Sequence, residues 1–143
     1  MKKPDQLSGI FEDRHFNNYP FVQIPQEFFD ERGSIQNIAD GVLGDVAVIQ
    51  SESKAIRANH FHKSDWHFTY MVAGSMIYEW SENLESQEKK SVVVNVGEMV
   101  YTPAGAPHKM TFQENSVFIA ISALSRTQKN YEEDTNRLPS NYF

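Results

Sequence analysis

Hydrophobic and polar positions alternate along this chain in many short runs, and turn residues separate the runs. Gly, Pro, Asn and Asp stand between them, which is typical of short antiparallel strands in a sandwich or barrel. No long segment holds a helical period before the tail, so the pattern predicts an all-β fold. The predicted strands cover residues 34–38, 45–50, 55–62, 66–72, 76–80, 91–96, 98–101 and 116–122.

The length of 143 residues predicts a single domain. Its core is expected over about 33–125, with an extended N-terminal arm over 1–32 and a short C-terminal tail over 126–143. Both flanks are polar with scattered aromatic residues, so we expect them to pack on the barrel or on a second copy. The chain has no cysteine, which excludes disulfides and cysteine-based zinc sites.

Charge narrows the range of partners. A net charge of −6 argues against nucleic acid or an anionic membrane as the main partner. A small-molecule substrate remains compatible, because a phosphorylated one needs only a local Arg or Lys. The N-terminus has no apolar stretch behind its lysines, and no run approaches the roughly 18 apolar residues of a membrane span. The sequence therefore favours a cytoplasmic protein.

Four of the five histidines form one spacing pattern. His60 and His62 are two residues apart, so on a strand their side chains point to the same face. His67 follows a short turn, and His108 ends a loop rich in Gly and Pro. Histidine is the commonest side-chain metal ligand. The four imidazoles predict a site for a divalent transition metal, namely Zn, Fe, Ni, Cu or Mn. The alternative is a set of hydrogen-bonded barrel residues.

Two segments resemble the motifs of the cupin family. Residues 60–74 read His-x-His-x4-His-x6-Gly, and residues 97–108 read Gly-x5-Pro-x-Gly-x2-His. The resemblance covers about 57–112 and implies an RmlC-like double-stranded β-helix, a jelly-roll barrel. His67 stands where the family usually has Glu, and Phe112 where it usually has Asn. The first difference removes a carboxylate from the implied ligand set.

A finer resemblance points to one group of enzymes within the family. Residues 56–63 (Ile-Arg-Ala-Asn-His-Phe-His-Lys) are similar to a stretch of nucleotide-sugar 3,4-ketoisomerases. Residues 30–33 (Asp-Glu-Arg-Gly) resemble a segment near the start of those enzymes and of the related 3,5-epimerases. This resemblance implies an isomerase or epimerase of surface-polysaccharide biosynthesis. In the ketoisomerases the two histidines of His-x-His act as acid and base without a metal.

The catalytic candidates follow from that chemistry. Moving a carbonyl along a sugar needs a base to remove a proton and an acid to return one. We expect His62 to be the base, His60 its partner acid, and Arg57 to bind a substrate phosphate or carbonyl oxygen. An ordinary imidazole pKa near 6.5 would give both histidines a usable fraction of each protonation state. A bound metal would occupy the same lone pairs, so the two roles compete.

Two further residues are expected to contact substrate. Thr69 and Met71 share a strand face with His67, so they enter the barrel if His67 points inward. Two other function classes remain open, an Fe-dependent dioxygenase and a cupin that binds a small ligand without turnover. We also expect a homodimer, formed when residues 33–38 add to the sheet edge of a neighbouring copy.

Overall fold

The computed structural model describes residues 1–25 and 27–143, and β-strands make up most of their regular secondary structure. The strands are β1 (Glu27–Asp30), β2 (Gly33–Gln36), β3 (Asp45–Ser51), β4 (Ile56–His62), β5 (His67–Ala73), β6 (Met76–Trp80), β7 (Lys90–Val94), β8 (Met99–Thr102), β9 (His108–Phe112), β10 (Ser116–Ser122) and β11 (Thr135–Arg137). A 3-10 turn, η1 (Asp13–Phe16), and a short helix, α1 (Gln128–Asp134), complete the elements. Neither helical element of the described residues is long and apolar enough to span a membrane.

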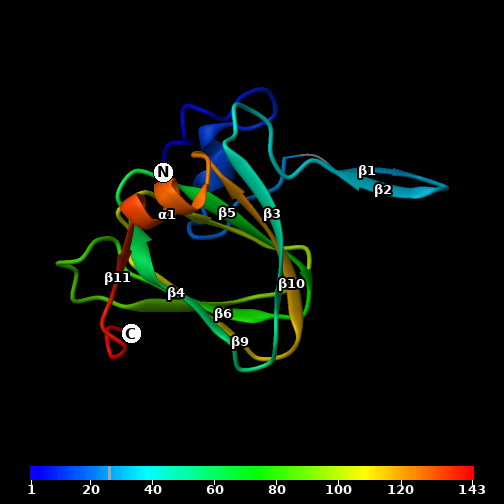
Figure 1. Ribbon diagram of the computed structural model, residues 1–143. Coiled ribbons are helices and arrows are strands. Elements are labelled where there is room, and N and C mark those ends of the chain that lie inside the picture. Colours follow the sequence, from blue (N-terminus) through cyan, green and yellow to red (C-terminus); the bar gives the residue numbers. More distant parts are fainter. Residues whose placement is uncertain (26) are drawn as a thin grey trace.

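Two antiparallel sheets form the walls of a barrel (Figure 1). One has the strand order β3-β10-β5-β8, and the other β11-β4-β9-β6-β7. Consecutive strands often belong to different sheets, as β4, β5 and β6 do, which gives the jelly-roll topology. The all-β jelly roll expected from the alternating pattern is confirmed.

Apolar side chains fill one part of the barrel interior. On β9, Met110 and Phe112 point inward, while the residues between them are more exposed. Phe112 stacks on Phe118 of β10, with 5.6 Å between ring centroids. This alternation with period two joins the two sheets through a single core. The buried members of the core are Met71, Met76, Tyr78, Trp80, Val94, Val100, Met110, Phe112, Phe118 and Ala120.

The first half of strand β5 is buried on both faces because the N-terminal segment covers its outer side. Phe68 is fully buried, and its ring lies 5.9 Å from that of Phe11 and 6.1 Å from that of Phe16. Leu7 joins the same cluster. The part of the N-terminal arm that carries Leu7, Phe11 and Phe16 therefore packs on the barrel, and β5 has a cavity-facing side and an arm-facing side.

The structure contains elements that the pattern did not predict. His108 begins strand β9, although the sequence placed it in a loop, because Pro103 and Pro107 gave a turn signal that concealed the short alternation after them. In the tail, α1 precedes β11, which pairs with β4. At the other end, β1 pairs with β2 to form a hairpin that projects from the barrel (Figure 1).

Candidate metal centre

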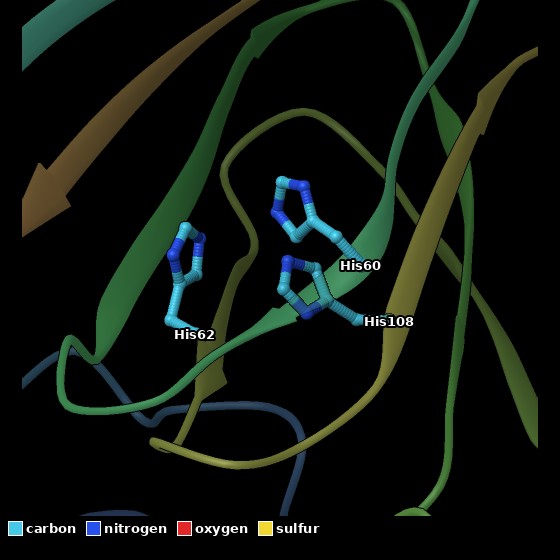
Figure 2. Close-up of side chains that lie close together, drawn as sticks. All are labelled: His60, His62 and His108. Carbon is cyan, nitrogen blue, oxygen red and sulfur yellow. The ribbon is translucent and has the colours of Figure 1, made fainter. Parts of the chain in front are cut away.

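The four histidines of the spacing pattern lie together inside one end of the barrel. β4 carries His60 and His62, β5 begins at His67, and β9 begins at His108. All four side chains are buried. The ring centroid of His60 lies 4.6 Å from that of His62 and 4.8 Å from that of His108. Figure 2 shows these three rings turned toward one another.

A β-bulge in β4 sets the position of His60. Ala58 and Asn59 have positive φ angles of 63° and 57°, and the register with β9 shifts between residues 58 and 60. The extra residue brings His60 opposite His108. Bulges that re-aim a side chain are common beside functional sites. The amide of Asn59 donates to the carbonyl oxygens of residues 138 and 139, which fixes the tail to the bulge.

A tight turn places His108 beside β4. The amide of Ala106 donates to the carbonyl oxygen of Pro103, and Gly105 between them has a φ of 82°. This left-handed conformation favours glycine. The amide of Gly105 donates to the carbonyl oxygen of His62 at 2.7 Å, so the turn is bound to the strand that carries two other histidines.

Hydrogen bonds fix which nitrogen carries a free lone pair. Nδ1 of His108 lies 3.0 Å from the carbonyl oxygen of Ala106, so it must be the protonated donor, and the lone pair is on Nε2. Nδ1 of His62 lies 3.4 Å from Oγ1 of Thr135 and 3.6 Å from Oδ2 of Asp134. Protein partners of this kind orient ligating imidazoles in metal sites.

The histidines fit a divalent transition metal. Nitrogens of His60, His62 and His108 all lie within 4.8 Å of one another. Among the described residues, Nε2 of His62 is buried without a hydrogen-bond partner. Two imidazoles on one tetrahedral ion have their nitrogens about 3.4 Å apart. Nε2 of His67 lies 3.2 Å from Nε2 of His108, so the expected fourth ligand adjoins the group of three.

Burial keeps the imidazoles neutral. Desolvation lowers the pKa of His62 to about 4 and that of His108 to about 3. It also lowers the pKa values of His60 and His67. The expectation of ordinary values near 6.5 is therefore wrong, because the rings have left water. Neutral imidazoles suit metal ligation or a basic role, whereas the acid role expected of His60 needs a protonated ring.

The predicted substrate residues lie in different places. Arg57 borders a cavity of about 60 Å³ above the histidines, and its guanidinium donates to Oγ of Ser51 and to the carbonyl oxygen of Gln50. Thr69 lines the same cavity with a buried hydroxyl that has no partner within the described part of the chain. Met71 packs in the apolar core and is not among the residues that line this cavity.

Three side chains beside the histidines, those of Arg126, Tyr131 and Asp134, were not predicted from the sequence. Arg126, four residues after the end of β10, forms an ion pair of 3.0 Å with Asp65, which lies in the turn between β4 and β5. The ring of Tyr131 lies 5.8 Å from that of His62. Asp134, at the end of α1, faces His62 as described above. These contacts join residues 61 to 72 positions apart in the sequence, so no local motif marks them.

Comparison with known proteins identifies the type of fold. No family model matches the chain. A curated relative, acireductone dioxygenase 1 of Coprinopsis cinerea, is 27% identical over 116 residues. This match covers 81% of the chain but only 55% of the relative, so the chain spans about half its length.

Solved structures resemble the chain over most of its length. The 3,4-ketoisomerase QdtA of Thermoanaerobacterium thermosaccharolyticum matches with a TM-score of 0.64 and 21% identity, over 82% of this chain and 86% of that one. The dTDP-4-dehydrorhamnose 3,5-epimerase of Sulfolobus tokodaii matches with a TM-score of 0.68 and 14% identity, over 83% and 76%.

A third match is to a longer protein. The capsular polysaccharide assembling protein CapF of Staphylococcus aureus has a TM-score of 0.61 and 22% identity, over 85% of this chain and 32% of CapF. The chain thus corresponds to about a third of CapF. At these identities the likeness concerns the fold, and it agrees with the two sequence motifs. The chain has the cupin fold of the RmlC-like type.

Proposed function

We propose that this protein is a metal-binding cupin enzyme that isomerises or epimerises a nucleotide-activated or otherwise anionic keto-sugar. The observation that carries the proposal is the convergence of His60, His62 and His108 in a buried cavity that Arg126 also lines. Likeness of fold to a 3,4-ketoisomerase and a 3,5-epimerase, over 82% and 83% of the chain, supports the reaction class. The sequence resemblance of residues 56–63 and 30–33 to enzymes of this class also supports it.

The ligand set favours an anionic substrate. His60, His62 and His108 would hold the ion, with His67 beside them. A divalent metal there would polarise a substrate oxygen and stabilise negative charge that develops on it. Burial keeps all four imidazoles neutral, and His67 stands where cupins usually have a carboxylate, so the ligand set carries no negative charge. The charge of the ion is therefore not cancelled by its ligands, which favours an oxyanion.

Metal binding excludes the use of His60 and His62 as free acid and base. With the ion absent, Nε2 of His62 carries an unshared lone pair and is the stronger candidate base. With the ion present, that lone pair is occupied. The neutral state of both rings supports the metal-bound form, and metal content decides between the two routes.

The test is proton exchange on a keto-sugar nucleotide. TDP-4-keto-6-deoxyglucose, a compound bound in a QdtA structure, is a suitable probe. We expect the metal-loaded protein to incorporate solvent deuterium into it, and to lose this activity after chelation and in His108→Ala. Exchange that survives chelation but disappears in His62→Asn would assign the reaction to a metal-free proton shuttle. Absence of exchange under all conditions contradicts the sugar-isomerase proposal.

An Fe-dependent dioxygenase is the second candidate function. The observation that favours it is the sequence match to acireductone dioxygenase 1. The cavity above the histidines, about 60 Å³, also suits a small molecule better than a whole sugar nucleotide. Oxygen consumption by the Fe-loaded protein with small hydroxy-ketone substrates would support this function. A cupin without turnover is the third possibility, and it predicts neither oxygen uptake nor proton exchange.

We further propose that the protein forms a homodimer through the β1–β2 hairpin. Phe28, Phe29 and Ile35 are 59%, 68% and 61% exposed on it. An isolated two-stranded hairpin is marginally stable in water, and this one stands away from the barrel (Figure 1). A second copy would cover these side chains and protect the strand edges. Sedimentation of Phe29→Asp should show a shift toward monomer, and an unchanged profile would contradict this interface.

A further inference from the structure

Arg126 is held firmly while part of its guanidinium has no acceptor. Its Nε donates to Oδ2 of Asp65 at 3.0 Å. Its Nη2 is buried and makes no hydrogen bond to any described residue. A buried charged donor without an acceptor is destabilising, so such groups are rare unless they have a function. Nη2 is therefore available to a ligand.

The surroundings of Arg126 prevent it from turning elsewhere for an acceptor. Asp65 is buried, and its other oxygen accepts the amide of Leu124 at 3.0 Å. On another side, the ring of Tyr131 lies 5.7 Å from the guanidinium carbon. The carboxylate fixes the orientation and the aromatic ring limits the space. The guanidinium is thus preorganised, which reduces the entropy lost when a ligand binds.

A pocket of about 160 Å³ lies beside the arginine. Arg126 and His62 line both this pocket and the smaller cavity above the histidines. A water molecule occupies about 30 Å³ of liquid, so the pocket has room for a carboxylate or phosphate group. A ligand group here would adjoin the candidate metal centre. The pocket is lined by His62, Asp65, Leu124, Ser125, Arg126, Asn130, Tyr131 and Asp134.

We propose that Arg126 binds the charged oxyanion group of the substrate, a phosphate or a carboxylate, in this pocket. The proposal deepens the proposed function and rests on it for the place of the reacting atoms. Arginine suits the task, because its planar fork matches the oxygens of both groups.

Asp134 makes the binding depend on the metal. Its carboxylate lines the same pocket and accepts the amides of Ser64 and Asp65 at 2.8 Å and 3.1 Å. Together Asp65 and Asp134 carry more negative charge than Arg126 offsets. A divalent ion on the neutral histidines reverses this balance. The anion should therefore bind the metal-loaded protein more tightly than the metal-free protein.

Calorimetric titration with inorganic phosphate and with acetate tests the assignment. At least one of them should bind the metal-loaded protein, and Arg126→Gln should weaken that binding by at least about tenfold. Arg126→Lys keeps the charge without the fork and should lie between. Arg137→Gln is the matched control, because this substitution also removes one positive charge nearby. Arg137 lies on the surface and pairs with Glu132 at 3.0 Å. Equal binding by Arg126→Gln and wild type, equal losses in both Gln variants, or no binding of either anion overturns the proposal.

A double variant and a titration with TDP complete the test. If Arg126→Gln fails to fold because Asp65 loses its partner, the double variant D65N/R126Q removes both charges and replaces it. Titration with TDP separates this proposal from the proposed function. Acetate binding that needs Arg126, without TDP binding, supports the oxyanion site and contradicts a nucleotide-sugar substrate. TDP binding that ignores Arg126 supports the nucleotide-sugar substrate and contradicts the site.

Discussion

The two ends of the barrel interior use the same strands for opposite purposes. On β9, His108 lies at one end and Phe112 at the other, and both are fully buried. On β5, His67 and Met71 show the same progression. The apolar end gains stability from close packing, whereas the histidine end holds desolvated polar rings, and Nε2 of His62 there is buried without a hydrogen-bond partner among residues 1–25 and 27–143. The comparison indicates that this fold concentrates its stability at one end and its chemistry at the other.

Truncation at the apolar end should have the largest effect on folding. Phe112→Ala removes a fully buried ring that stacks on Phe118, and we expect a loss of about 3–5 kcal/mol in the free energy of unfolding. Urea denaturation measures it. Val93→Ala, at a half-exposed position of β7, is the control and should change stability by less than about 0.5 kcal/mol. The folded fraction of Phe112→Ala should still bind as many metal ions per protein molecule as the wild type. Loss of metal would contradict the separation of stability and chemistry between the two ends.

Truncation at the histidine end should have the reverse effect. His108→Ala should lower metal affinity by more than about 100-fold, since even residues that only orient ligands change affinity by 10–100-fold. The fold should persist, because the turn before it is set by Pro103 and Gly105. Metal analysis and circular dichroism on the same sample measure both quantities. Unchanged metal content in a folded His108→Ala protein would refute the ligand assignment.

The sequence predicted the fold well because alternation with period two is a local property. Runs such as 76–80 and 116–122 appear as β6 and β10 with the predicted limits. The histidines were predictable because their spacing is visible in the sequence itself. Arg126 and Asp65 were not, since their pairing depends on where the end of β10 meets the turn before β5. The lowered pKa values were hidden too, because a spacing pattern does not report desolvation.

The histidine end should also make the metal-free protein sensitive to acid. In the unfolded chain these histidines titrate near 6.5, whereas burial lowers the pKa of His62 to about 4 and of His108 to about 3 in the folded chain. Between these values the unfolded state binds more protons, so stability falls as pH falls below 6.5.

Each such histidine contributes about 1.4 kcal/mol per pH unit within its window. Urea denaturation at pH 7.5, 6 and 5 measures how steeply the free energy of unfolding changes with pH. His60→Gln should reduce this slope by the contribution of one histidine. The apolar variant Phe112→Ala should lower stability at every pH and keep the wild-type slope. An equal slope in His60→Gln would mean that acid acts elsewhere in the molecule.

The smallest expected effect is a change in metal affinity when His67 is replaced. The direction of this change shows what His67 does in the site. Nε2 of His67 lies 3.2 Å from Nε2 of His108, whose lone pair is free because its Nδ1 donates to Ala106. Without metal, His67 must therefore donate a proton to His108. A metal ion bound to Nε2 of His108 removes this acceptor. His67 then has one of two roles: it binds the ion as a fourth ligand, or its hydrogen bond to His108 competes with metal binding.

His67→Gln distinguishes these roles through the direction of the change in metal affinity. We expect a fall of about tenfold or more, because His67 lies at ligand distance from His108 and its own imidazole is neutral. Competitive metal titration with a chromophoric chelator measures the change, and Thr69→Val is the control for altered packing on the same strand face. A rise in affinity would show that His67 opposes the ion, and would reduce the site to the three rings of Figure 2.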